Sequence, residues 1–125
     1  MRGGVMPSGW KLHPDSRDRL LALFPPRYAR TVASHVTRTV EARPGDPLPP
    51  AIHHARVVGH IDDPMGVEAL VVALDGSTAR PDGGTWHITW SLAEDRAARD
   101  SNAALAQGAW KPRDGGRIDL IPAVW

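Results

Sequence analysis

Two short motifs hold the side chains best suited to chemistry. Each is a histidine followed two positions later by a threonine, in His35-Val36-Thr37 and in His87-Ile88-Thr89. Histidine has an unperturbed pKa of about 6.5, so one imidazole can accept a proton while another donates one near neutral pH. A threonine hydroxyl can donate to a phosphate oxygen and stabilise charge that builds in a transition state. These are the groups that phosphoester cleavage needs, because the attacking oxygen loses a proton and the leaving oxygen gains one.

The alternation of polar and apolar residues around both motifs predicts that each lies in a β-strand. Side chains two positions apart leave the same face of a strand. In residues 84–92 this rule places three polar side chains together, those of His87, Thr89 and Ser91. Residues 31–40 repeat the pattern, with His35 and Thr37 on one face and valines on the other. The two tryptophans of the first segment, Trp86 and Trp90, fall opposite His87, which favours core packing over base stacking.

Length and composition limit the class of protein. We expect one domain over residues 1–125, with the glycine-rich residues 1–9 loose or forming an edge strand. The net charge of +1 creates no strong field that attracts nucleic acid or an anionic membrane. The chain has no cysteine, which excludes disulfides, thiolate nucleophiles and cysteine zinc sites. Chemistry is therefore left to histidines and carboxylates.

No segment of the sequence has the pattern of a membrane span or a secretory signal. The longest apolar run, residues 69–74, is far too short to cross a bilayer. Residues 1–4 are not followed by the apolar stretch of a secretory signal. We therefore expect a soluble, cytoplasmic monomer with no membrane partner.

The patterning along the chain predicts an α+β fold with two helices. The first helix is expected over residues 16–24, with Asp15 as N-cap and Pro25-Pro26 as the stop. The second is expected over residues 93–107, ended by Gly108. Strands are expected at residues 31–40, 55–61, 67–74, 85–92 and 118–124, with a further strand possible before the first helix. The segment 67–74 has the composition of a central strand buried on both faces.

Four further residues are candidates for substrate binding. Ser91 either contacts phosphate or sugar or caps the following helix, and Tyr28 can stack on a base. Lys11 and Arg80 can offset phosphate charge from flanking loops, with solvated surface as the alternative for each. The long loop 75–84, which contains Arg80, is either a substrate-gripping loop or a plain hairpin loop.

A metal site is not expected. Three more histidines, His53, His54 and His60, lie between the two motifs. Their spacing matches no familiar ligand pattern, so we expect neither a metal nor another cofactor.

The motifs resemble those of the 2H phosphoesterases, a family named for two His-x-Thr motifs on β-strands. The segment Phe24-Pro25-Pro26-Arg27-Tyr28 before the first motif, and the segment 86–92 around the second, look like small bacterial members related to the cyclic phosphodiesterase domain of fungal-type tRNA ligases. The resemblance extends over most of the chain from Trp10 onward. Two departures are Arg38 and Trp90, which follow the threonines where the family usually has an apolar residue. The chain is also shorter than most members, which implies trimmed substrate-binding loops.

This resemblance implies a compact bilobal fold of antiparallel strands and two helices, with the active-site cleft between the two motif strands. It implies metal-independent hydrolysis of a 2′,3′-cyclic phosphate of a nucleotide or RNA end, with His35, His87, Thr37 and Thr89 as catalytic residues. Two alternatives stay open: hydrolysis of 2′,5′-linked or cyclic oligonucleotides, and a non-catalytic module that binds a nucleotide or an RNA end. Which histidine is the base is not distinguished by the sequence.

Overall fold

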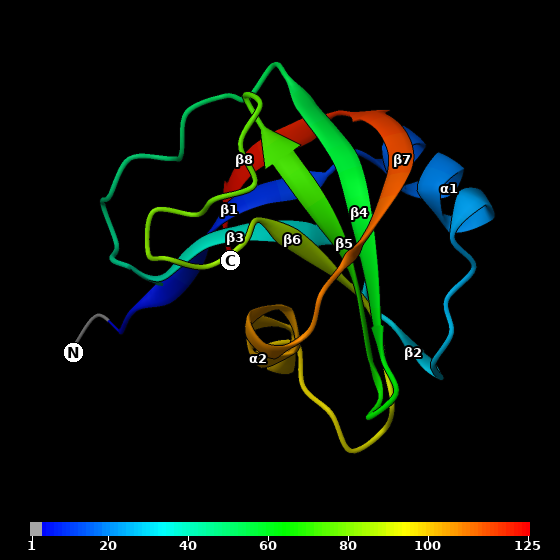
Figure 1. Cartoon of the computed structure of the whole chain (residues 1–125). Coiled ribbons are helices and arrows are strands. Elements are labelled where there is room, and N and C mark those ends of the chain that lie inside the picture. Colours follow the sequence, from blue (N-terminus) through cyan, green and yellow to red (C-terminus); the bar gives the residue numbers. More distant parts are fainter. Residues whose placement is uncertain (1–3) are drawn as a thin grey trace.

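The fold is a curled antiparallel sheet with a helix on each face, described for residues 4–125 in a computed structural model (Figure 1). Within these residues the elements follow the chain as β1 (Met6–Leu12), α1 (Pro14–Leu23), β2 (Arg30–Thr31), β3 (His35–Ala42), β4 (Ala55–Asp63), β5 (Val67–Leu74), β6 (His87–Leu92), α2 (Asp100–Gln107), β7 (Lys111–Ile118) and β8 (Leu120–Val124). The strands are ordered β7-β4-β5-β6-β3-β1-β8, and the short β2 also pairs with β6. The α+β class and the two helices are confirmed.

The strand β5 is central and buried on both faces, as its sequence predicts. Leu70 and Val72 pack into the larger core, which contains Leu20 of α1. Ala69 and Val71 face the other way, into a smaller cluster with Leu105 of α2. Alternating apolar side chains of one strand therefore fill the space under both helices.

The larger core contains most of the aromatic side chains. Trp10, Phe24, Trp86 and Trp90 are all buried there, and the Trp90 indole N–H donates to the carbonyl of Phe24 at 2.7 Å. Trp10 and Trp86 meet edge to face with ring centroids 5.5 Å apart. The prediction that Trp86 and Trp90 are core residues is confirmed.

Both predicted helices differ from expectation at their N-termini. α1 begins at Pro14, and its N-cap is His13, whose Nδ1 accepts from the backbone N–H of Asp15 at 3.1 Å. α2 is eight residues long and begins only at Asp100, because residues 93–99 form turns. The Asp100 carboxylate accepts from the backbone N–H of Ala97 at 2.8 Å, which stabilises this turn in place of a further helical turn.

The strand assignments are wrong at three places. The predicted strand 31–40 is interrupted between β2 and β3, where Ala33 has a φ of 46°. The strand considered before the first helix is present as β1, but it is an interior strand between β3 and β8, neither loose nor at an edge; residues 1–3 of the expected loose segment lie outside the described range. β7 was not expected, because Lys111-Pro112-Arg113-Asp114-Gly115-Gly116 lacks polar and apolar alternation.

Within residues 4–125, no helix is both long and apolar enough to cross a membrane.

Candidate functional site

The two motifs lie on neighbouring strands and on one face of the sheet. β3 and β6 run antiparallel, with Val36 directly opposite Ile88. Both of these side chains are fully buried in the larger core. Because strand side chains alternate, the histidines and threonines that flank Val36 and Ile88 lie on the opposite face. The fold therefore brings together two motifs that are far apart in sequence.

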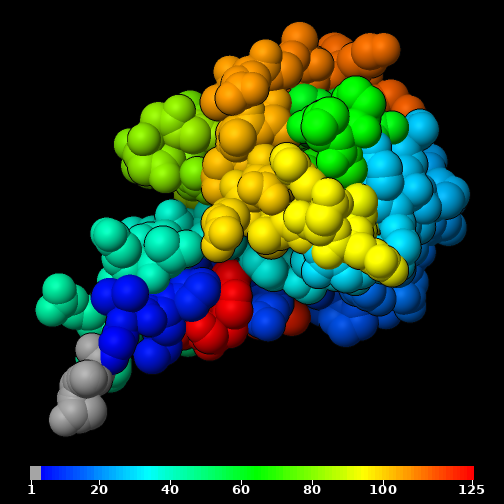
Figure 2. Space-filling model, turned by 90° about the horizontal axis from the view of Figure 1, so that it is seen from below, coloured from blue at the N-terminus to red at the C-terminus, as the bar shows by residue number. Residues whose placement is uncertain are grey.

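Figure 2 looks onto this side of the molecule. α2 and the segment before it, in orange and yellow, lie on one side, and the end of β8, in red, lies on the other. α2 packs on β5 and β4 and contacts β6 through the Ser101 and Thr89 hydroxyls, while β3, β1 and β8 follow β6 in the sheet. The motif face is thus bordered by α2 at one edge and by β8 at the other.

His87 has one ring nitrogen fixed and the other without a protein partner among the described residues. Its Nδ1 lies 2.7 Å from the carbonyl oxygen of Thr85, which can only accept, so Nδ1–H donates. The neutral imidazole then has its lone pair on Nε2. Burial lowers the pKa of His87, and the charge of Arg80 adds to this effect, while the bond to Thr85 opposes it. The lowered pKa favours the neutral ring, in which Nε2 is the nitrogen that can accept a proton.

The His35 ring contacts Ser34 and Trp125. Its Nδ1 shares a hydrogen bond of 2.6 Å with the Ser34 hydroxyl, and its ring lies 4.6 Å, between centroids, from the indole of Trp125. Burial lowers the pKa of His35, and the charges of Lys11 and His87 lower it further. Lys11 stands directly opposite His35 on β1, so the two side chains share a face. The charge of His87 is among the causes of the lowered pKa of His35, which agrees with the placement of both imidazoles on one face of paired strands.

The two threonines differ in what surrounds them. The Thr89 hydroxyl lies 2.8 Å from the Ser101 hydroxyl of α2 and donates to the Ala98 carbonyl at 3.3 Å. Both Thr89 and Ser101 are buried. Thr37 is partly exposed and stands opposite Gly9, a position where a Cβ would run into the backbone of β3. Thr37 is thus the more accessible of the two.

Arg80 lies beside His87, at the edge of the motif face. Its Nε is 2.8 Å from Asp82 Oδ1, and its Nη2 donates to Asn102 Oδ1 at 3.0 Å. Its side chain is only 11% exposed, which is low for an arginine in a loop. A pocket of about 80 Å³ lies where the loop meets α2; its lining includes Arg80, Thr85 and Leu105. The loop 75–84 is therefore attached to α2 next to one motif.

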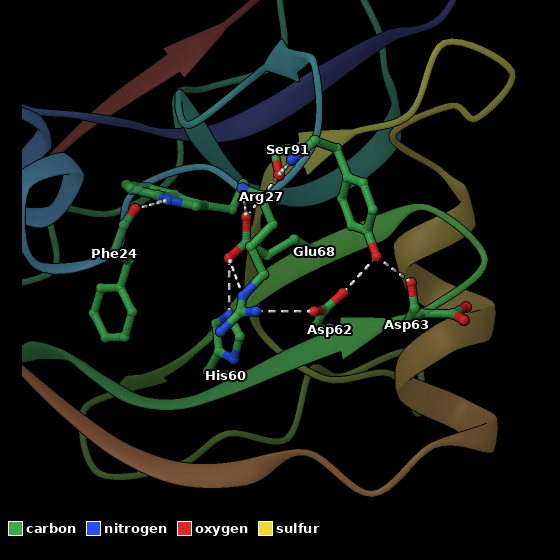
Figure 3. A network of polar contacts seen from close by, with 9 residues as sticks. Phe24, Arg27, His60, Asp62, Asp63, Glu68 and Ser91 are labelled. Atoms are coloured by element: carbon green, nitrogen blue, oxygen red, sulfur yellow. Dashed lines mark hydrogen bonds and ion pairs between the residues drawn. The ribbon is translucent and has the colours of Figure 1, made fainter.

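Ser91 does not share the face of His87, and this expectation is wrong. The register between β5 and β6 shifts by one residue, so that Thr89 stands opposite Ala69 but Ser91 stands opposite Glu68. The extra residue, Trp90, reverses the alternation. Ser91 is fully buried, and its hydroxyl donates to Glu68 Oε1 at 2.6 Å (Figure 3). It does not cap α2 either, because the N-cap of that helix is Arg99.

Tyr28 belongs to the same network as Ser91. Its hydroxyl donates to Asp62 Oδ1 at 2.6 Å and lies 2.9 Å from the Asp63 carbonyl, at the turn between β4 and β5 (Figure 3). Burial raises the pKa of Tyr28 to about 12, and the bond to Asp62 contributes. These contacts give Tyr28 a structural role and do not support its assignment as a base-stacking residue.

Sequence reasoning missed Trp125, which reaches the motif face from β8. Its backbone N–H donates to the Pro7 carbonyl at 2.9 Å, which extends the pairing of β8 with β1. The Lys11 Nζ lies 5.1 Å from the centroid of the indole ring. No motif marks this residue, and only the register of β8 places it near His35.

Among residues 4–125, no three histidine, aspartate or glutamate side chains gather in a way that could hold a metal ion. His60, one of the three other histidines considered from the sequence, lies 2.9 Å from Glu68 Oε2 and stacks on Phe24.

No family model, curated protein or solved structure matches this chain.

Proposed function

We propose that the protein is a metal-independent phosphodiesterase of the 2H type, which hydrolyses a 2′,3′-cyclic phosphate of a nucleotide or RNA end. The observation that carries the proposal is the common face of His35 and His87 on paired strands, on either side of the Val36–Ile88 pair. Each imidazole has its Nδ1 engaged, by Ser34 and Thr85 respectively. Each Nε2 is therefore the nitrogen available to a substrate.

In the proposed reaction, a water molecule attacks phosphorus and gives its proton to Nε2 of one histidine. The new P–O bond forms as the bond from phosphorus to a ribose oxygen breaks, and the second histidine protonates that oxygen. The tautomer fixed by Thr85 makes His87 the suitable base, since its lone pair lies on Nε2. His35 is then the acid, and Thr37 binds a non-bridging phosphate oxygen.

The bilobal arrangement of the family is part of the same proposal. Within the described residues, β3 and β6 are registered through one residue pair, whereas their outer neighbours pair over several. A sheet joined so narrowly is suited to curl into two halves, one built on β4, β5, β6 and β7 and the other on β1, β3 and β8. The substrate phosphate would lie where the halves meet.

The test is hydrolysis of adenosine 2′,3′-cyclic phosphate in the presence of EDTA, with products separated by chromatography. We expect conversion to a monophosphate by the wild type. His35→Ala and His87→Ala should each lower kcat by roughly 100-fold or more, the usual contribution of a general acid or base. His54→Ala is the matched control, because His54 is exposed in the loop after β3. Loss of activity with EDTA, restored by a divalent ion, would contradict the metal-free reaction.

The same assay separates the alternatives. A 2′,5′-linked dinucleotide and a cyclic dinucleotide are added as parallel substrates, and preferential cleavage of either would move the assignment to that class. Binding of adenosine 2′-phosphate by the wild type without conversion of any substrate would identify a binding module. The binding module is worth testing because the Thr89 hydroxyl already forms a hydrogen bond with Ser101.

A further inference from the structure

Trp125 and Lys11 form a cluster with His35 that the proposed reaction does not use. The sheet order β6-β3-β1-β8 places His87, His35 and Lys11 on three successive strands, and Trp125 directly follows the end of the fourth. The register aligns Lys11 with His35 on one side and with Ile121 on the other. Trp125 is four residues beyond Ile121, so alternation places it on the same face as Lys11 and His35.

A gap over β1 lets the indole reach across to β3. Gly9 stands opposite Ala123 on β8 and opposite Thr37 on β3. Gly9 has no side chain and Ala123 has only a methyl group, so no bulky side chain stands on the sheet between β8 and β3 at this level. The Trp125 ring comes within 4.6 Å of the His35 ring, between centroids. An aromatic surface is therefore built beside one imidazole, on the side away from His87.

The Lys11 side chain, which lies over the indole ring, is flexible. Lys11 is exposed, its side chain has four flexible bonds, and its ammonium lies over the indole ring 5.1 Å from the centroid. A cation over an aromatic ring that water can reach is held only weakly. A flat ring can replace it at small cost, and the ammonium is then free to approach an anion.

We propose that Trp125 is the platform on which the nucleobase of the substrate stacks, and that it makes the site selective for cyclic phosphates that carry a base. This inference rests on the proposed function, because it places the phosphate between His35 and His87 and the base beyond His35. Stacking suits this role because every nucleobase has a π-face. The predicted ligand class is therefore a nucleoside 2′,3′-cyclic phosphate, with little discrimination among bases.

The experiment compares two ligand pairs with and without a base. Hydrolysis is measured on adenosine 2′,3′-cyclic phosphate and on methyl riboside 2,3-cyclic phosphate. Binding is measured separately by calorimetry with the corresponding 2-phosphates, adenosine 2′-phosphate and methyl riboside 2-phosphate. The variants are Trp125→Ala, Trp125→Phe and the control Val40→Ala, a truncation at an exposed position of β3 beyond the motif.

Trp125→Ala should weaken binding and raise KM for the adenosine ligands by roughly fivefold or more, as expected for a lost base stack, and leave the base-free ligands unchanged. Trp125→Phe should restore most of the affinity, and Val40→Ala should match the wild type. Equal losses for both ligand pairs, or no loss for either, would overturn the proposal.

The readouts also separate this proposal from the hydrolase itself. If Trp125 governs binding of adenosine 2′-phosphate but the wild type converts no cyclic phosphate, the platform stands and the hydrolase proposal fails. If the wild type hydrolyses both cyclic phosphates with the same KM, the hydrolase proposal stands and the platform fails.

Discussion

At the scale of single residues, the proposed reaction needs one imidazole as acid and the other as base. Burial lowers the pKa of both His35 and His87, and the charge of His87 further disfavours protonation of His35. Two imidazoles that share one phosphate site titrate as a pair, so the first proton is easier to add than the second. The singly protonated pair, with one acid and one base, is the form that the proposed reaction uses.

The pH dependence of kcat/KM should therefore be a bell whose maximum lies below about pH 6.5, the unperturbed histidine value. Because the pKa of each histidine is lowered, both protonation steps of the pair occur at a lower pH than in a free histidine. The singly protonated form is most abundant between the two steps. Initial rates at low substrate over pH 4.5 to 8.5 measure this. A maximum above pH 7, or a single rising limb, would contradict the paired assignment.

The two threonines provide a matched comparison. Thr37→Val should lower kcat by roughly tenfold to 100-fold with little change in stability, because its hydroxyl is assigned to the phosphate. Thr89→Val should instead cost about 1–3 kcal/mol of stability, since it leaves the buried Ser101 hydroxyl without its partner. Urea unfolding and kcat measured on both variants give the comparison. Equal catalytic effects in two equally stable variants would show that the threonines act alike.

At the scale of elements, the position of the first motif depends on how closely β1 approaches β3. A Cβ at Gly9 would collide with the Val36 carbonyl, on the strand that carries His35 and Thr37. The register shift between Ser8 and Gly9 lies at the same place. A glycine in β1 therefore positions a functional strand that is distant in sequence.

Gly9→Ala should lower stability by about 1–3 kcal/mol, the usual range for overpacking, and should also reduce activity. The control is Gly4→Ala, because nothing lies within 4 Å of a Cβ at Gly4. Unfolding midpoints and hydrolysis rates of the two variants test this. If Gly9→Ala is as stable as Gly4→Ala, the close approach does not determine the position of β3.

Local patterning was sufficient for some elements and not for others. β5 was predicted with correct bounds because eight apolar-rich residues stand between two turns, and the two motifs were placed in strands by their alternation. Ser91 was placed on the wrong face because strict alternation takes no account of the bulge at Trp90. β7 was missed, and Trp125 with it, because their placement depends on pairing with β4 and β1, which are distant in sequence.

At the scale of the whole molecule, a buried carboxylate connects the loop after α1 with strands β4 and β6 of the sheet. Glu68 is 1% exposed and accepts from Ser91 Oγ, from the Arg27 backbone N–H at 3.0 Å and from His60 (Figure 3). Burial alone would raise the pKa of Glu68, but these hydrogen bonds outweigh it, so the pKa is lowered. The network fixes the segment between α1 and β2 without contributing a group to the motif face.

Glu68→Gln should reduce the free energy of unfolding at pH 7 by about 1–3 kcal/mol, because the hydrogen bonds to a buried charge are lost. A lowered pKa means that the contribution of Glu68 is full above the unfolded value of about 4.5 and is lost as the pH falls through the folded value. The difference between wild type and variant, measured by urea unfolding, should therefore shrink as the pH falls below about 4.5. A difference that stays constant would show that the charge of Glu68 is not responsible.

The central claim is that His35 and His87 share one phosphate, and NMR titration of the imidazole nitrogens tests it most directly. Adenosine 2′-phosphate is added to the ¹⁵N-labelled protein at several pH values, with His35→Ala and His87→Ala used to assign the signals. We predict that both Nε2 resonances shift with a single dissociation constant and that both pKa values rise in the complex, because a bound anion favours each imidazolium. If only one of the two histidines responds, or neither does, the shared phosphate site is wrong.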